Sequence, residues 1–212
     1  MIEVLAAASI GGFARLLTSV RSNWIGCSQV SSGPRVYFAN HASHGDFVLI
    51  WTVLTPVLKR RVRPVAGGDY WTRGPIRKWV ADKVFRAIII DRTKIDRSHS
   101  PLPAMAVAID QGASLIVFPE GTRNTTDALL LPFKCGLYHL AKMRPSIEFM
   151  PVWIANLNRV LPKGEWLPVP MLCRVTFGRP IKIAEGESKA AFLKRAHVCL
   201  ADLAGPKRGD LQ

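Results

Sequence analysis

The sequence predicts a single α/β domain, in which a mostly parallel or mixed sheet is flanked by helices and follows an N-terminal amphipathic helix. Two observations support this fold class. Short apolar runs rich in Val and Ile alternate along the chain with longer segments of helical periodicity, the pattern of strands joined through helices. The 212 residues also suffice for one domain with a sizeable core. We expect an N-terminal segment over residues 1–27 and the main domain over residues 28–212.

The first predicted element is an amphipathic helix over residues 2–25. Its apolar side chains recur at spacings of three and four and comprise Ile2, Ala6, Ile10, Phe13, Leu17, Val20 and Trp24. The opposite side carries Arg15, Thr18, Arg21 and Ser22. An apolar stripe opposed by cationic residues is typical of a helix that lies on a membrane surface. The alternative is that the stripe packs on the core of the domain itself.

A strand, a polar turn and a helix follow, and the turn contains a His and an Asp five residues apart. The apolar residues 35–39 predict a short buried strand, and the apolar run after the turn predicts a helix over residues 44–58. A carboxylate bonded to one ring nitrogen of a histidine fixes the tautomer in which the other nitrogen accepts a proton near neutral pH. We therefore predict that His41 and Asp46 form a general-base dyad.

This turn has two other interpretations. Ser43 and Asp46 are residue types that cap the N-terminus of a helix, in which case His41 would be an ordinary loop histidine. His44 is a second candidate for the base, but it lies only two residues from Asp46, too close in a first helical turn to face it.

The next stretch begins with a dense run of basic residues at 59–63, whose simplest interpretation is a solvated surface. Residues 62–66 predict a strand that ends at two glycines, and residues 76–84 predict a short helix. The β-branched run 87–90 predicts a buried strand. Arg92 follows this strand and is a candidate ligand for an anion.

The clearest strand, residues 114–118, comes after a predicted helix over 103–111 and runs into a turn at 119–124. A proline ends the strand, and a glycine allows a tight turn with exposed backbone N–H groups. Together with the hydroxyl of Thr122 and the guanidinium of Arg123, such a turn can cradle a phosphate. The alternative is an ordinary polar turn.

The rest of the chain continues the same alternation of elements. We predict helices over 132–141 and 188–203, strands over 147–154 and 172–177, and a proline-rich loop over 161–170. Strands and helices thus alternate to the last predicted helix, as the fold class requires.

The composition limits the possible partners. The chain carries 29 Lys and Arg against 15 Asp and Glu, so its net charge is +14, which favours a polyanion or an anionic surface. The four cysteines are widely scattered without the spacing of a metal site, and we expect reduced thiols and no bound metal. No apolar run reaches the roughly 20 residues of a transmembrane helix. No secretory signal is expected either.

Four stretches in this order resemble the glycerolipid acyltransferase family, in particular its lysophosphatidic acid acyltransferases. They are His41 to Asp46 with Asn40 before it, Ile88-Ile89-Ile90-Asp91-Arg92, Phe118-Pro119-Glu120-Gly121-Thr122-Arg123, and Met150-Pro151-Val152-Trp153-Ile154. The resemblance covers about residues 35–180. It departs from the family where Arg86-Ala87 stands in place of a usual glycine, and in having no membrane-spanning segment ahead of the first stretch.

The resemblance implies a glycerol-3-phosphate acyltransferase-like fold and a catalytic domain over residues 28–212. It implies a reaction without a cofactor, in which acyl-coenzyme A or acyl-[acyl carrier protein] gives its acyl group to the hydroxyl of a lysophospholipid. The favoured acceptor is 1-acyl-glycerol 3-phosphate, which would become phosphatidic acid. His41 would be the general base, oriented by Asp46.

The resemblance also implies where the substrates bind. The guanidinium groups of Arg92 and Arg123, with Lys134, would hold the phosphate of the acceptor. Thr122, in the same turn as Arg123, would also bind the substrate. Backbone N–H groups near Gly121 would stabilise the oxyanion. Glu120 would either hold the glycerol hydroxyl or orient Arg123. With a lipid substrate and residues 1–27 as a membrane-associating segment, the expected location is the cytoplasmic face of the cell membrane, as a peripheral or monotopic protein on an anionic surface.

Other functions are compatible with parts of the sequence. The same reaction could use another acceptor, such as a lyso-ornithine lipid or glycerol 3-phosphate. A thioesterase or lipid hydrolase could use the same dyad on water, although the chain has no G-x-S-x-G nucleophile motif. The charge would suit a nucleic-acid-binding module, but the basic residues are dispersed and no recognised motif is present, so we expect no nucleic-acid partner.

Overall fold

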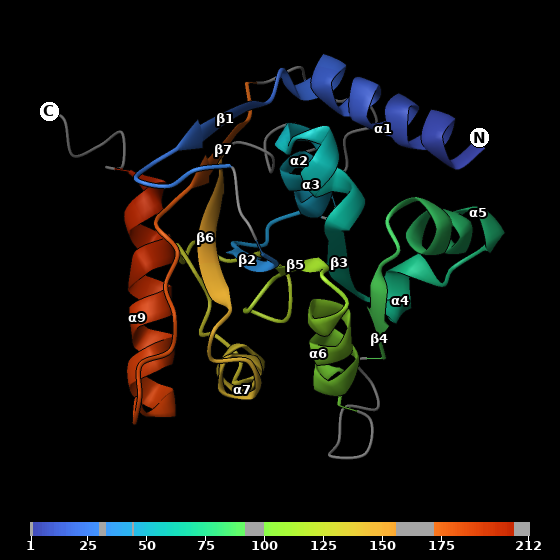
Figure 1. The fold of residues 1–212 in the computed structure, drawn as a ribbon. Helices are drawn as coiled ribbons and strands as arrows, with labels where there is room; N and C mark the ends of the chain where they lie inside the picture. The colour runs from blue at the N-terminus through green and yellow to red at the C-terminus, as the bar shows by residue number, and fades with distance from the viewer. Residues whose placement is uncertain (1, 30–32, 44, 92–99, 156–171, 206–212) are drawn as a thin grey trace, which may run out of the picture.

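The computed structural model describes residues 2–29, 33–43, 45–91, 100–155 and 172–205, and these form one mixed sheet covered by helices on both faces (Figure 1). The strand order is β1-β7-β6-β2-β5-β3-β4. The strands are β1 (Arg21–Trp24), β2 (Arg35–Ala39), β3 (Val62–Gly67), β4 (Ile88–Ile90), β5 (Ser114–Val117), β6 (Glu148–Ala155) and β7 (Arg174–Phe177). Neighbouring strands are parallel except for β6 and β7. The predicted fold class is therefore confirmed.

The helices divide between the two faces of the sheet, with α1 and α2 on one side and α6, α7 and α9 on the other (Figure 1). The helices and helical turns are α1 (Ile2–Thr18), α2 (Asp46–Val53), α3 (Pro56–Arg61), α4 (Gly68–Trp71), α5 (Pro75–Trp79), the π-helical turn η1 (Val80–Val84), α6 (Leu102–Asp110), α7 (Gly136–Met143), α9 (Lys189–Ala201) and the 3₁₀ turn η2 (Asp202–Ala204). Each face of the sheet has its own apolar core. Along β2, Tyr37 lies in the core beneath α1 and α2, while Val36 and Phe38 lie in the core beneath α6, α7 and α9. This alternation is expected of a central strand.

The N-terminal helix is shorter than the predicted helix over residues 2–25. It ends at Thr18, whose hydroxyl donates to the carbonyl of Ala14, and Ser19 has a left-handed φ of 39°. The following residues form β1, which pairs in parallel with β7 at the far end of the chain. The ring of Trp24 stacks on Phe177 with 3.8 Å between centroids. This pairing is a tertiary interaction, and local periodicity does not reveal it.

Three further predictions differ in detail from the structure. The helix predicted over 44–58 is divided into α2 and α3, because the chain is extended at Leu54 and Pro56 begins a new helix. The strand predicted to be buried at 87–90 is β4, an edge strand in which Ile89 is 41% exposed. The helix predicted to start near residue 132 begins at Gly136. The proline-rich loop over 161–170 lies outside the described residues.

Candidate active site

Three loops meet at one edge of the sheet, where parallel strands end. They follow β2, β5 and β3, which are neighbours in the sheet and run in the same direction. The turn from Asn40 to Asp46 follows β2, the turn 118–124 follows β5, and α4 follows β3. Residues at the carboxyl ends of adjacent parallel strands can combine into one site, although they are far apart in the sequence.

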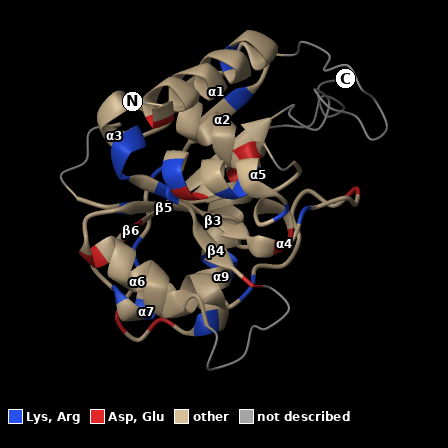
Figure 2. Ribbon diagram, turned by 90° about the vertical axis from the view of Figure 1, so that its right-hand side faces the viewer, with Lys and Arg blue, Asp and Glu red and all other residues tan. Residues whose placement is uncertain are grey.

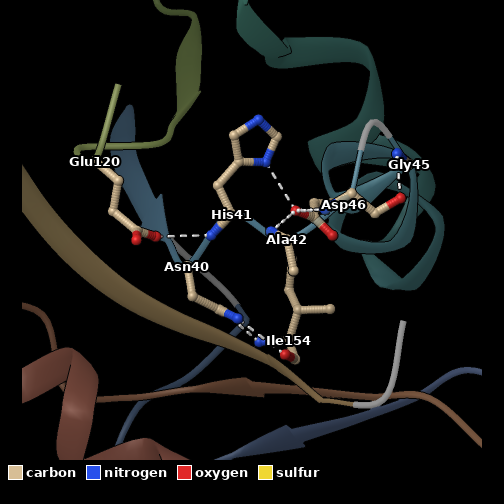
Figure 3. Close-up of polar contacts among 8 residues, drawn as sticks. Asn40, His41, Ala42, Gly45, Asp46, Glu120 and Ile154 are labelled. Carbon is tan, nitrogen blue, oxygen red and sulfur yellow. Dashed lines mark hydrogen bonds and ion pairs between the residues drawn. The ribbon is translucent and has the colours of Figure 1, made fainter. Parts of the chain in front are cut away.

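The two residues predicted to form a dyad are in contact in the structure. Nδ1 of His41 lies 2.8 Å from Oδ2 of Asp46, and both side chains are buried. The same carboxylate oxygen accepts the backbone N–H groups of Ala42, at 2.7 Å, and Ser43, at 2.9 Å. The other ring nitrogen, Nε2, points away from the carboxylate (Figure 3). The carboxylate beside Nδ1 favours the tautomer with its proton there, which leaves Nε2 as the proton acceptor.

The capping interpretation of this turn is correct only in part. Asp46 is the first residue of α2 and tethers the preceding turn through Ala42 and Ser43, but it also contacts the imidazole ring. Ser43 is not the N-cap, since the helix begins after Gly45, whose N–H donates to the Ser43 hydroxyl. His44, the competing candidate for the base, lies outside the described residues.

The backbone and the ring of His41 are held by the turn that follows β5. The backbone N–H of His41 donates to Oε1 of Glu120 at 2.9 Å, and its carbonyl accepts the N–H of Asn124 at 2.6 Å. The imidazole stacks on Phe118 with 4.1 Å between ring centroids. On the other side, the amide of Asn40 forms a two-point bridge to the backbone of Ile154 (Figure 3). The orientation of His41 is therefore fixed by several independent contacts.

Glu120 points into the protein and not into an open space. It is 1% exposed, and its second oxygen, Oε2, accepts the N–H of Leu131 at 2.8 Å. Burial raises the pKa of this carboxyl above its ordinary value, although the N–H groups of Leu131 and His41 oppose the shift. Each carboxylate oxygen thus already has a backbone donor, and no bond between Glu120 and Arg123 is found in the described part of the chain.

Two other predicted site residues, Thr122 and Arg123, lie on the exposed side of the same turn. Thr122 and Arg123 line a pocket of about 160 Å³ together with His41. Gly121 has a left-handed φ of 74°, its N–H donates to the carbonyl of Phe118, and a side chain on it would approach Lys134 to 3.1 Å. The structure therefore brings His41, Thr122 and Arg123 together, with Lys134 covering Gly121. Arg92 lies outside the described residues.

The opposite wall of the pocket was not predicted. It is built by the short helix α4 and the residues before it, and includes Asp69, Tyr70 and Trp71. The ring of Trp71 meets Phe47 edge to face, with 5.4 Å between centroids. In the sequence, Gly67 and Gly68 indicated the end of a strand. The acidic and aromatic residues that follow them directly were the feature from which a pocket wall could have been predicted.

Several known proteins are similar to this chain in sequence. The acyltransferase family model matches residues 21–155. A 1-acyl-sn-glycerol-3-phosphate acyltransferase from Haemophilus influenzae is 27% identical over 147 residues, which are 66% of this chain and 55% of that protein. The protein of the same name from Limnanthes douglasii is 32% identical over 155 residues, 69% of this chain and 50% of that protein. The chain spans about half the length of the curated relatives it matches.

A solved structure has the same fold. The crystal structure of the 1-acyl-sn-glycerophosphate acyltransferase from Thermotoga maritima superposes with a TM-score of 0.71, covering 95% of this chain and 80% of that chain at 20% sequence identity.

Proposed function

The chain belongs to the acyltransferase family, and from this membership and the geometry of its site we propose that it moves a fatty acyl group from a thioester to a lysophospholipid hydroxyl. The acceptor that we propose is 1-acyl-glycerol 3-phosphate, and the product is phosphatidic acid. The observation that carries the proposal is the bond between Nδ1 of His41 and Asp46, at a histidine that also lines the pocket. One end of the reaction centre is thus a base, and the other, at Arg123, is a cation.

The proposed mechanism needs no covalent acyl-enzyme. Nε2 of His41 takes the proton of the acceptor hydroxyl as that oxygen attacks the thioester carbonyl. The tetrahedral intermediate then collapses, the carbon–sulfur bond breaks, and the imidazolium returns the proton to the leaving thiolate. The negative charge of Asp46 stabilises the imidazolium while it exists. The donor is acyl-coenzyme A or acyl-[acyl carrier protein], and no cofactor takes part.

The turn after β5 supplies the positive end of the site. Arg123, with Arg92 and Lys134, would bind the acceptor phosphate through charged hydrogen bonds. Because the N–H of Gly121 already donates to Phe118, the oxyanion would be stabilised by the backbone N–H of Thr122. A pocket of about 160 Å³ is small for a complete lysophospholipid, so it would hold the reacting groups while the hydrocarbon chains extend beyond it.

An assay of the reaction tests this proposal directly. Purified protein is incubated with each acyl donor and a panel of lysolipid acceptors, and the products are identified by mass spectrometry. Phosphatidic acid formed from 1-acyl-glycerol 3-phosphate supports the proposal. A product formed only from a lyso-ornithine lipid or glycerol 3-phosphate would support the proposed acyl transfer but contradict the proposed acceptor. Fatty acid released at the same rate without any acceptor would identify a hydrolase instead.

The Arg123→Ala variant should bind a phosphate-bearing acceptor more weakly, because it removes a guanidinium from the pocket wall. A charged hydrogen bond is worth about 1.5–3 kcal/mol, which corresponds to roughly a 10–150-fold rise in the KM of the acceptor. The KM of the acyl donor should change much less. Arg174→Ala, which removes an exposed arginine on β7, is the matched control. An unchanged acceptor KM together with an unchanged kcat would exclude Arg123 from the site.

We also propose that α1 lies on an anionic membrane surface at the cytoplasmic face of the cell membrane. One side of this helix packs on the domain, where a side chain on Gly11 would meet the ring of Trp51 and where Ile10 packs against the core. The predicted stripe is therefore divided between two environments, because Phe13 is 62% exposed while Ile10 is partly buried. The large apolar side chains exposed on α1 are Ile2, Val4, Leu5, Phe13 and Leu16.

The surroundings of α1 suit a peripheral or monotopic association. The helix α3, which carries Lys59, Arg60 and Arg61, adds a basic run to this side of the protein (Figure 2). Positive charge beside exposed apolar side chains matches an interface that contains anionic lipids. No helix in the described ranges is long and apolar enough to cross a bilayer.

A double substitution on the exposed side of α1 tests this association. Phe13→Ser with Leu16→Ser should weaken binding to vesicles rich in anionic lipid at least about tenfold, since each change removes an apolar side chain from the interface. The measurement is liposome flotation, with thermal unfolding to verify the fold. Val107→Ser and Val198→Ser are matched controls, because these exposed valines lie on α6 and α9, across the sheet from α1. A double variant that floats like the unmodified protein would exclude α1 as the contact.

A further inference from the structure

We infer that Glu120 is a positioning residue for His41 and does not bind the acceptor. The inference rests on the proposed function and assigns a role within the same site. It starts from the direction of the buried side chain, whose carboxylate accepts the backbone N–H of His41 (Figure 3) and, through its second oxygen, the backbone N–H of Leu131.

The carboxylate joins three parts of the chain. The backbone of Glu120 belongs to the turn after β5. Its Oε1 accepts the N–H of His41, and its Oε2 accepts the N–H of Leu131. A second link runs parallel to it, because the carbonyl of His41 accepts the N–H of Asn124. The residue proposed as the base is therefore held at both of its backbone polar groups by one turn. Rotation of its backbone would break both bonds.

Only an ionised carboxylate can accept both of these hydrogen bonds with a charged oxygen. Two backbone N–H groups converge on the side chain, and each needs an acceptor because the site is buried. A glutamine of the same size offers one acceptor oxygen and one NH₂ donor, so one of the two N–H groups would face another donor. The native glutamate is thus matched to two donors, and this requirement has nothing to do with a substrate hydroxyl.

The same turn divides its side chains between two tasks. Glu120 is buried and bonds to the backbone, whereas Thr122 and Arg123 are exposed and line the pocket. A left-handed conformation at Gly121 separates the two groups and lets the chain reverse direction between them. Loss of Glu120 should therefore disturb the base, while loss of Arg123 should disturb the acceptor.

The experiment compares Glu120→Gln and Glu120→Asp with the unmodified enzyme. We expect Glu120→Gln to lower kcat by about 10²-fold, because a small displacement of a reacting group has that effect, while the acceptor KM stays within about threefold. Glu120→Asp keeps both acceptors on a shorter side chain and should retain more activity. Glu148→Gln is the matched control, since it removes a carboxylate that bonds Arg35 at the opposite end of β2. All variants are compared at a temperature where thermal unfolding shows them folded.

A second measurement does not depend on turnover. Long-range ¹H–¹⁵N spectra of the histidine rings report which nitrogen carries the proton, and the His41 signals are assigned by their loss in His41→Ala. We expect the proton on Nδ1 in the unmodified protein, a mixture of tautomers in Glu120→Gln, and no change in Arg123→Ala or Glu148→Gln. These spectra decide the role of Glu120 even if the unmodified protein transfers no acyl group to any acceptor.

Two results would overturn the inference. A Glu120→Gln variant with unchanged kcat and a raised acceptor KM would make Glu120 a substrate ligand. A variant whose only change is a lower unfolding temperature, with kcat, KM and the His41 tautomer unchanged, would make it a purely structural residue.

Discussion

The His41→Ala variant should lose about 10²–10⁴-fold in kcat, because it removes the group that accepts the proton of the attacking hydroxyl. The substitution leaves the backbone bonds of this residue to Glu120 and Asn124 available, so the turn itself should persist. The measurement is the steady-state rate with saturating acceptor and donor, together with thermal unfolding. The variant should still bind the acceptor, since the pocket keeps Arg123.

Two other histidines serve as controls for this variant. His44→Ala tests the competing candidate in the same turn, and His139→Ala removes an exposed imidazole on α7. Both should retain most of the activity. If His44→Ala lost more activity than His41→Ala, the base would be assigned to the wrong histidine.

The second large effect is expected for Asp46→Asn. The side chain keeps its shape, but an amide can donate a hydrogen bond to Nδ1 and so favours the tautomer with the proton on Nε2, which cannot accept another. It also removes the charge that stabilises the imidazolium. In a serine protease triad the corresponding change lowers kcat by about 10⁴-fold, and we expect a loss of about 10²–10⁴-fold here.

The control for Asp46→Asn is Asp110→Asn, which breaks an exposed ion pair with Arg144 on the other side of the sheet. It should leave kcat unchanged. An Asp46→Asn variant that works within about threefold of the unmodified rate would exclude the carboxylate from the mechanism. Its histidine spectra would then be expected to show the original tautomer.

The features predicted correctly from the sequence are those that depend on residues close together along the chain. The five central strands were found within a few residues, because each is a short apolar run bounded by turn residues. The His41–Asp46 contact was predicted because both partners belong to one turn, and their chemistry is specific at that spacing. The helix α9 begins after Ser188, whose hydroxyl accepts the N–H of Ala191. This N-cap involves residues only three positions apart, so the sequence indicates it directly.

The missed features depend on residues that are distant in the sequence. β1 is a strand because β7 offers it a free edge, and Arg21–Trp24 has no apolar alternation of its own. The inward direction of Glu120 follows from the positions of His41 and Leu131, which only the assembled sheet brings near it. The pocket wall at Asp69 and Trp71 arises because α4 folds over the ends of neighbouring strands.

The place of β1 in the sheet also bears on the order in which a growing chain can fold. The strands that position His41 and Glu120, β2 and β5, pair with each other and lie within the first 117 residues. β1 precedes both, yet its partner β7 comprises residues 174–177 and is synthesised much later. Contacts between such distant segments close the largest loops and form slowly. On the ribosome, the segment after α1 would therefore remain without its strand partner until β7 is synthesised, although β2 and β5 could already have paired.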